Sequence, residues 1–368
     1  MSTSGRGLPP EWGTDLSGTG SQTTWPTHLD TKGYRTPIAS GPSVNLRIVS
    51  GSANRALASK ISSALDVGSV LGEVERFPDG ELGPVVPAVR GGDVFIVAPT
   101  GPMVNDHLVE LLLLIDACRR AGADRVTAVV PYFGYARQDR RGQDGQAIGA
   151  RVVATAIAAA GADRLIVIDP HTAAFEAMFA IPVETLTAVP TLSHFLRPVV
   201  TPDAVVVAPD LGAIKLAERY GSLLSLPVAI VRKTRLTGAT VRAEELVGHV
   251  HGRPTVVVDD MITTGATIEA TVRLLLANGA RPDVIVAATH GLFVGEAAER
   301  LAGLPVRRLV VTDSLQQTQT IGQPVEVTSI GPLLAAFIGR LHRDEPIGDL
   351  VGAPDDLGHR PDRHGSGV

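Results

Sequence analysis

The sequence VVVDDMITTGAT, residues 256–267, decides the fold of this chain. Its three valines follow Arg253-Pro254 and predict a short buried strand, and the apolar spacing from Ile268 to Asn278 predicts a helix. The polar residues between them form a tight loop. In an open parallel sheet, ligands bind at the carboxyl ends of the strands, where a following helix presents unpaired N–H groups. The stretch therefore predicts an α/β fold with a ligand site at this loop.

The loop carries the groups that a sugar phosphate needs. Three threonines within residues 263–267 supply hydroxyls, and Gly265 lacks a Cβ, so a phosphate can approach the backbone closely. Asp259 and Asp260 cannot hold the same phosphate, and they suit diol hydroxyls or a Mg²⁺ ion that bridges to phosphate oxygens. The alternative is a simple strand end with an N-cap, which requires only one of these polar side chains.

This segment resembles the phosphoribosyl-diphosphate-binding loop shared by type I phosphoribosyltransferases and phosphoribosyl diphosphate synthases. Thr263 stands where many members of these families have Asp, and Ala266 stands where a second Gly is common, but the hydroxyl and N–H donors remain. The resemblance implies that ribose 5-phosphate is bound by Asp259, Asp260, Thr263, Thr264, Gly265, Ala266 and Thr267. It leaves the reaction open.

Composition limits the class of protein. A chain of 368 residues with 44% hydrophobic and 19% charged residues is typical of a globular protein with room for two domains. A formal charge of −5 gives no reason to expect nucleic acid binding. The single cysteine, Cys118, cannot form an internal disulfide, which favours a cytoplasmic location. We expect no membrane association, because no stretch approaches the roughly 18 apolar residues of a spanning helix and the N-terminus lacks a signal-peptide core.

Strand and helix patterns alternate along the chain, which predicts βαβ units and parallel sheets. The order of strand, turn and helix is similar in the two halves, so we expect two related α/β domains at residues 44–187 and 188–330. Residues 331–351 are expected to form a terminal helix that packs back on the domains. Residues 1–43 and 352–368 are polar and lack periodicity, and we expect them to be disordered tails.

Five further segments lie at predicted turns or strand ends and concentrate charged and aromatic side chains. They are VERFPDGE (74–81), PYFGYARQDRR (131–141), DPH (169–171), APDLG (208–212) and VRKTRL (231–236). Together with residues 256–267, they resemble phosphoribosyl diphosphate synthases (ribose-phosphate diphosphokinases) in the correct order along about 300 residues, from near Leu46 to near Leu350. Residues 142–149 carry no positive charge, and this stretch and residues 233–236 are closer to the archaeal-type branch of the family.

The resemblance implies a fold of the type I phosphoribosyltransferase-like kind and an activity. The diphosphoryl group of ATP would pass to the 1-hydroxyl of ribose 5-phosphate, and AMP would leave. Mg²⁺ would be held by His171 and Asp210. Lys233 and Arg235 alternate on an extended segment and would stabilise charge on the transferring phosphates, with Arg235 also contacting ribose 5-phosphate. Contacts to ATP would come from Phe77, Asp79, Gly80, Glu81, Arg137 and Gln138.

In this family the turn at residues 74–81 is supplied by a neighbouring subunit, so the resemblance also implies a homo-oligomer. Two other interpretations of the whole chain stay open. A type I phosphoribosyltransferase would share residues 256–267, but it would normally be a single domain and would have no reason to carry residues 131–141. A catalytically silent homologue would bind and regulate an active synthase, and its sequence is expected to have lost the lysine, the metal ligands or the Asp pair.

Overall fold

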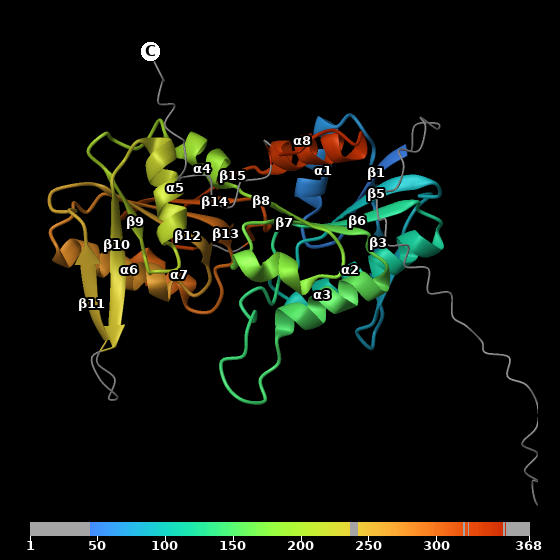
Figure 1. Cartoon of the computed structure of the whole chain (residues 1–368), viewed down its shortest axis with the longest axis horizontal. Coiled ribbons are helices and arrows are strands. Elements are labelled where there is room, and N and C mark those ends of the chain that lie inside the picture. Colours follow the sequence, from blue (N-terminus) through green and yellow to red (C-terminus); the bar gives the residue numbers. More distant parts are fainter. Residues whose placement is uncertain (1–44, 236–241, 319–320, 323, 349, 351–368) are drawn as a thin grey trace, which may run out of the picture. The chain divides into compact units, whose positions relative to one another are not determined.

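The computed structural model describes residues 45–235, 242–318, 321–322, 324–348 and 350. The two predicted tails, 1–43 and 352–368, lie outside the described residues. The described part contains two large β-sheets with helices packed against them and one separate β-hairpin (Figure 1). All of these elements belong to one compact unit. The domain boundaries at 187/188 and 330/331 stay predictions.

The first sheet has six parallel strands in the order β2-β1-β5-β6-β7-β8. Its central strands are buried on both faces, which explains why they appear in the sequence as continuous apolar runs. The strands are β1 (Asn45–Ser50), β2 (Ser69–Leu71), β5 (Gly92–Val97), β6 (Arg125–Val130), β7 (Arg164–Ile168) and β8 (Val183–Leu186). The helices of this half are α1 (Arg55–Ala64), α2 (Val104–Arg120), α3 (Gly149–Ala160) and the 3₁₀ helix η1 (Ala173–Met178). The hairpin consists of β3 (Glu73–Arg76) and β4 (Leu82–Val85).

The second sheet has seven strands in the order β11-β10-β9-β12-β13-β14-β15, and all neighbours are parallel except β10 and β11. Its strands are β9 (Val205–Ala208), β10 (Val228–Arg235), β11 (Arg242–Val247), β12 (Thr255–Ile262), β13 (Val284–Gly291), β14 (Val306–Thr312) and β15 (Val325–Thr328). The helices that precede or connect these strands are α4 (Val189–Leu196), α5 (Ile214–Leu224), α6 (Ala266–Ala277) and α7 (Ala297–Ala302).

The prediction of an α/β fold with two related parallel sheets is confirmed. The two sheets have the same strand order once the edge strand β11 is left out. The order β2-β1-β5-β6-β7-β8 in the first sheet corresponds to β10-β9-β12-β13-β14-β15 in the second. Residues 233–235 were expected on an extended segment, and β10 does run on to Arg235, where β11 pairs with it in antiparallel fashion. Single-sequence patterns missed β2, β8 and β15, which are short strands at sheet edges.

Two helices join the halves reciprocally. Helix α4 follows β8 of the first sheet but packs against α5, whereas α8 (Gly331–His342) follows β15 of the second sheet and packs against α1 (Figure 1). Both begin with a proline at their second position, Pro190 and Pro332, where the missing N–H costs no helical hydrogen bond. One apolar core therefore contains Phe95 of the first sheet, Val206 of the second and Phe337 of α8.

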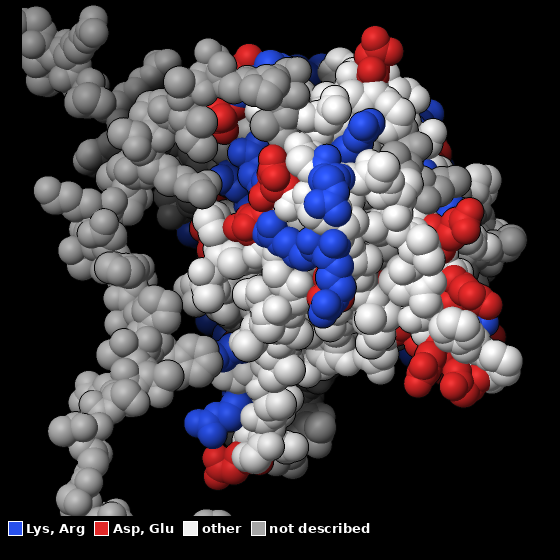
Figure 2. Space-filling model, turned by 90° about the vertical axis from the view of Figure 1, so that its right-hand side faces the viewer, with Lys and Arg blue, Asp and Glu red and all other residues white. Residues whose placement is uncertain are grey.

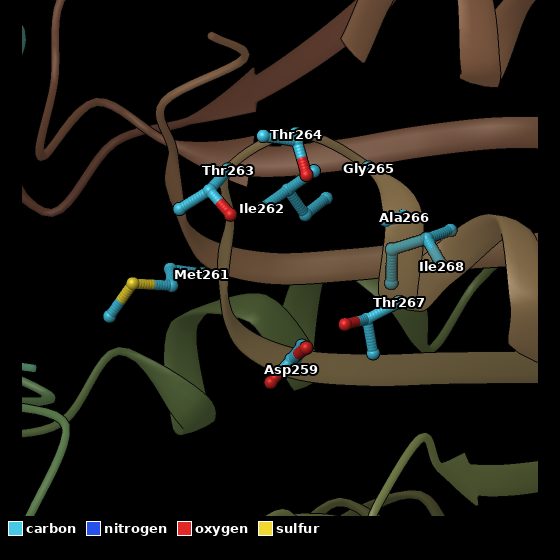
Figure 3. Close-up of a pocket in the computed structure, with 9 residues that line it drawn as sticks. All are labelled: Asp259, Met261, Ile262, Thr263, Thr264, Gly265, Ala266, Thr267 and Ile268. Atoms are coloured by element: carbon cyan, nitrogen blue, oxygen red, sulfur yellow. The ribbon is translucent and has the colours of Figure 1, made fainter. Parts of the chain in front are cut away.

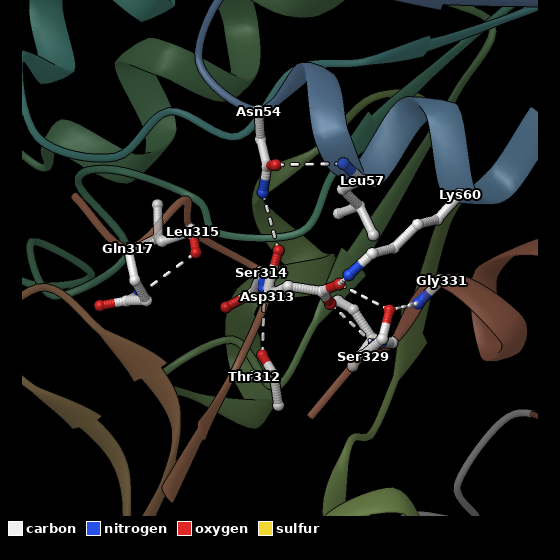
Figure 4. Close-up of polar contacts among 11 residues, drawn as sticks. Asn54, Leu57, Lys60, Thr312, Asp313, Ser314, Leu315, Gln317, Ser329 and Gly331 are labelled. Atoms are coloured by element: carbon white, nitrogen blue, oxygen red, sulfur yellow. Dashed lines mark hydrogen bonds and ion pairs between the residues drawn. The ribbon is translucent and has the colours of Figure 1, made fainter. Parts of the chain in front are cut away.

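Polar contacts fix both ends of α8. At its start, Asp313 accepts hydrogen bonds from the Ile330 N–H at 2.8 Å and from Lys60 Nζ of α1 at 2.8 Å, and Asn54 Nδ2 donates to the Asp313 carbonyl at 2.7 Å (Figure 4). At its end, His342 Nδ1 lies 2.8 Å from the buried carboxylate of Asp93, which Arg125 also contacts. These contacts attach the C-terminal helix to the first half of the chain.

Charges of both signs share the side of the molecule drawn in Figure 2, where Lys and Arg side chains gather near the middle and carboxylates lie beside them. Several arginines have carboxylate partners, among them Arg119 with Asp163 and Arg164 with Glu184. Within the ranges that the structure describes, no helix has the length and apolar character required to cross a membrane.

Candidate active site

The central loop is shorter than the sequence suggested. Strand β12 continues through Asp259 and Asp260 to Ile262, so only residues 263–265 separate it from α6. Successive side chains of a strand point to opposite faces. The two aspartates therefore have different neighbours, and the site has two sides.

Asp259 lies on the side of the phosphate loop. It borders a pocket with the side chains that follow it, and Figure 3 shows Asp259 and Thr267 on facing sides of the hollow while Met261 points away. The pocket is lined by Asp259, Met261, Ile262, Thr263, Thr264, Gly265, Ala266, Thr267 and Ile268. Gly265 has φ 75°, a left-handed conformation that favours glycine, and it starts α6. The first N–H groups of the helix, together with the threonine hydroxyls, make this pocket suitable for a phosphate.

Asp260 faces the other half of the chain. Its Oδ2 lies 2.7 Å from Nδ1 of His171, which follows β7 of the first sheet. The hydrogen bond to Asp260 raises the pKa of His171 above its usual range. Burial opposes ionisation of Asp260, but the hydrogen bond and charge of His171 outweigh it and lower the pKa of that carboxyl. The contact is therefore a hydrogen bond that joins the two halves.

The pKa of Asp259 is shifted in the opposite direction from that of Asp260. Burial and the negative charges of Asp260 and Asp210 raise the pKa of Asp259 well above its usual value. Asp210 lies just beyond the end of β9, where its Oδ1 accepts hydrogen bonds from the N–H groups of Gly212 at 2.9 Å and Ala213 at 3.2 Å. The structure thus brings His171, Asp210, Asp259 and Asp260 into one cluster at the carboxyl ends of β7, β9 and β12.

The turn after β6 also borders this cluster. The positive charge of Arg137 acts on His171 and on Tyr132, and Asp260 acts on Tyr132 as well. Arg137 and Gln138 are both exposed. The Gln138 backbone is held in the turn, since its N–H donates to the Tyr135 carbonyl at 2.8 Å and its own carbonyl accepts from Ala150 at 3.2 Å. Both side chains are therefore available to a ligand at the edge of the cluster.

The other predicted ATP contacts lie elsewhere, on the turn of the β3–β4 hairpin. Phe77 is 40% exposed, and the turn is closed by the Phe77 N–H, which donates to the Glu81 carbonyl at 2.9 Å, and by the Glu81 N–H, which donates to Asp79 Oδ1 at 3.1 Å. Gly80 has φ 96° at the tip. The structure describes no contact between these four residues and His171 or Asp260.

Lys233 and Arg235 belong to the end of β10, and their backbones pair with Glu244 and Arg242 of β11. Strand β10 pairs with β9, the strand that leads to Asp210. The two basic residues therefore belong to a strand that lies next to the one leading to the acidic cluster.

Comparisons with known proteins identify the family. Residues 46–161 match the family model described as the N-terminal domain of ribose phosphate pyrophosphokinase, and residues 234–352 match the phosphoribosyl synthetase-associated domain. The ribose-phosphate pyrophosphokinase of Rhodopirellula baltica is 42% identical over 310 residues, which cover 83% of this chain and 98% of that protein. The chain belongs to the ribose-phosphate pyrophosphokinase family.

Other members of the ribose-phosphate pyrophosphokinase family agree. The ribose-phosphate pyrophosphokinase of Staphylococcus saprophyticus is 38% identical over 312 residues, which cover 83% of this chain and 96% of that protein. The crystal structure of phosphoribosylpyrophosphate synthetase from Mycobacterium smegmatis superposes with a TM-score of 0.76 at 37% identity, and the match covers 82% of this chain and 99% of that one. Since these matches span both sheets, they favour a pyrophosphokinase over a single-domain phosphoribosyltransferase.

The acidic cluster also bears on the metal that this family membership suggests. Within the described residues, no three His, Cys, Asp or Glu side chains stand close enough to hold a metal ion by themselves. Mg²⁺ commonly binds proteins through one or two carboxylates and takes its remaining ligands from water and substrate phosphates. The described residues therefore fit a Mg²⁺ ion held by one or two side chains better than a closed site made only of protein ligands.

Some residues behind the cluster were not recognised from the sequence as important. Thr289 and His290 at the end of β13 and Ser314 after β14 are all buried. Thr289 and His290 contact the segment that leads to His171, and Ser314 contacts His290. The available signal was weak: two polar residues, Thr289-His290, directly follow an apolar strand, as they would at many strand ends. Their partners are more than a hundred residues away in the sequence.

Proposed function

We propose that this protein is a ribose-phosphate pyrophosphokinase. It transfers the β,γ-diphosphoryl group of ATP to the 1-hydroxyl of ribose 5-phosphate and forms 5-phosphoribosyl 1-diphosphate and AMP, a step in nucleotide biosynthesis. One observation carries the proposal: the pocket formed by Asp259 and residues 261–268 lies in a chain that matches proteins of this name over nearly their whole length.

Ribose 5-phosphate would bind in that pocket. Its phosphate would accept hydrogen bonds from the N–H groups at the start of α6 and from the threonine hydroxyls, as anions do at helix N-termini. Its ring hydroxyls would reach the strand that bears Asp259 and Asp260. Positioning is the main contribution that a protein makes to phosphoryl transfer, so a rigid strand and helix are suitable supports for this substrate.

ATP would bind on the other side of the acidic cluster. In-line attack by the 1-hydroxyl on the β-phosphorus spreads negative charge over the transferring group. Lys233 and Arg235 are assigned to stabilise that charge, and Arg137 and Gln138 to hold the nucleotide. The position of Lys233 and Arg235 at the end of β10, next to the strand that leads to Asp210, supports this assignment.

The exposed hairpin turn suggests a homo-oligomer. Phe77, Asp79, Gly80 and Glu81 are exposed and have no described contact with the acidic cluster of their own chain. We assign them to the adenine side of the ATP site in a neighbouring subunit. An exposed phenylalanine on a closed turn can stack on a base without reorganising its own backbone.

Mg²⁺ is the proposed metal, with His171 and Asp210 as the residues that hold it. When bound, the ion would supply positive charge to the phosphates of ATP. Asp260 orients His171 through the bond to Nδ1, and the N–H groups of Gly212 and Ala213 orient Asp210. We place the protein in the cytoplasm, because its single cysteine is a buried free thiol, as expected in a reducing compartment.

The decisive experiment measures AMP. Purified full-length protein is incubated with ATP and Mg²⁺, with and without ribose 5-phosphate, and the nucleotides are separated by chromatography. AMP that forms only when the sugar phosphate is present supports the proposal. An unchanged ATP pool would instead favour a silent regulatory homologue, and release of ADP would indicate a simple phosphatase or kinase.

A further inference from the structure

His290 joins three strand ends behind the candidate site. It is 2% exposed, and its Nε2 lies 3.1 Å from the Ile168 carbonyl at the end of β7. Its Nδ1 lies 2.8 Å from Ser314 Oγ after β14, and its ring meets Tyr132, which follows β6, edge-on at 5.1 Å between centroids. The imidazole therefore ties the second sheet to two strand ends of the first.

The partners of His290 fix its tautomer. A carbonyl oxygen can only accept a hydrogen bond, so Nε2 must carry the proton that points to Ile168. Burial lowers the pKa of His290 and keeps the ring neutral, so Nδ1 carries no proton and accepts from the Ser314 hydroxyl. The Thr289 carbonyl, also 3.2 Å from Ser314 Oγ, then takes its hydrogen bond from Thr312 Oγ1 at 2.7 Å. Every polar atom of the imidazole is satisfied in one arrangement.

Thr289, which precedes His290 on β13, contacts Asp169, which follows Ile168. Thr289 Oγ1 donates to Asp169 Oδ2 at 2.7 Å, and the same oxygen accepts from the Ala188 N–H at 2.9 Å. Asp169 has φ 39°, in the left-handed region that is unfavourable for most residues other than glycine. Such a conformation persists when its surroundings hold it. Asp169 is two residues before His171, so this strained turn sets the direction in which the chain leaves β7.

We propose that Thr289 and His290 are positioning residues for the transfer reaction. They clamp the backbone of Ile168 and the side chain of Asp169 to β13, and thereby hold His171 of the first half against Asp260 on β12, the strand next to β13. The role in catalysis rests on the proposed function, whereas the contacts that form the clamp do not depend on it.

The chain offers a matched control for testing this role. Thr289→Val removes one hydroxyl from a buried threonine at almost constant volume, and Thr289→Ser keeps the hydroxyl. Thr255, at the opposite end of β12, is also fully buried, and its hydroxyl has no hydrogen-bond partner among the described residues. Thr255→Val therefore makes the same substitution without breaking a contact to the His171 segment.

Two measurements are made on these variants. Steady-state kinetics should show kcat reduced about 10- to 100-fold in Thr289→Val, the effect usual for residues that orient a ligand-binding side chain. The KM for ribose 5-phosphate should stay near its wild-type value, Thr289→Ser should recover most of kcat, and Thr255→Val should resemble wild type. In the His171→Ala background, Thr289→Val should cause little further loss, because the two residues act in series.

The second measurement does not depend on activity. Crystal structures of wild type and Thr289→Val should show the 2.7 Å contact between His171 Nδ1 and Asp260 Oδ2 in wild type only. Full kcat in Thr289→Val, losses that multiply independently with His171→Ala, or an unchanged contact would each overturn the clamp. If Thr289→Val does not fold, Ser314→Ala, which removes the partner of His290 Nδ1, is measured in the same way. A wild-type protein that releases no AMP refutes the proposed function, and the crystal structures still decide the clamp.

Discussion

His171 Nδ1 and Asp260 Oδ2 stand 2.7 Å apart, although one residue follows the first sheet and the other lies within the second. This contact crosses between the halves at the place where the acidic cluster forms. Its two members have pKa values shifted in opposite directions, that of His171 upward and that of Asp260 downward. The pair consequently makes stability depend on pH in a defined window.

The first prediction concerns that window. A histidine with a raised folded pKa stabilises the protein below its ordinary value of 6.5, and this contribution is lost as pH rises through the raised value. Asp260, with a pKa lowered from 3.8, contributes above 3.8 and loses its contribution as pH falls. Urea unfolding should therefore show Asp260→Asn most destabilised relative to wild type between these two values, and less so at pH 9. The matched control is Asp139→Asn, whose charge acts on His171 more weakly and which should show a smaller pH dependence.

The second prediction concerns the phosphate loop. Gly265→Ala places a Cβ at φ 75° and 3.3 Å from Leu301 Cγ, which strains the start of α6. We expect the KM for ribose 5-phosphate to rise at least tenfold, with a much smaller change in the KM for ATP. Gly303→Ala adds the same methyl group nearby, where φ is −92° and no atom lies within 4 Å, and it should leave both constants unchanged. Equal effects of the two substitutions would contradict the assignment of this pocket.

The third prediction concerns the attachment of α8. Asp313→Ala removes the acceptor for the buried Ile330 N–H and the partner of Lys60, so we expect it to lower the free energy of unfolding by about 2–4 kcal/mol. Asp344→Ala removes an ion pair whose carboxylate is 85% exposed, and it should cost less than about 1 kcal/mol. Urea titrations followed by far-ultraviolet circular dichroism give both values. A small loss for Asp313→Ala would show that the contacts of Asp313 contribute little to holding α8 in place.

The fourth prediction concerns the thiol. Burial raises the pKa of Cys118 to about 12, so almost no thiolate exists at pH 8, and the nucleophilic form is the thiolate. Native protein should react with a chromogenic disulfide reagent only very slowly, and protein in 6 M guanidinium chloride should release one equivalent of chromophore at once. Cys118→Ser should abolish the signal in denaturant. Rapid reaction of native protein would mean that α2 opens frequently.

The sequence was informative wherever function depends on neighbours along the chain. Residues 256–267 indicated their strand, loop and helix because one short segment contains both the apolar run and the phosphate-binding groups. The opposite orientation of Asp259 and Asp260 could not be predicted, because it depends on how far β12 extends, and pairing with β13 decides that. Edge strands such as β15 were missed because they are short and carry few apolar residues.

Contacts between distant segments could not be predicted from the sequence for a related reason. Asp169 and Thr289 are 120 residues apart, and neither has a local pattern that distinguishes it from other polar residues at strand ends. Likewise, a spacing argument can suggest that α4 and α8 are helices, but it cannot say that each packs on the other half. These features follow from tertiary arrangement and required the structure.

The reciprocal exchange of α4 and α8 constrains how the enzyme can move. Each half contributes one helix that packs on the other half. A hinge motion that separates the halves would therefore expose apolar surface on both helices at once. An opening motion of this kind would therefore cost free energy. Displacement of loops at the strand ends would expose far less apolar surface, so we expect substrate entry and product exit to depend on those loops.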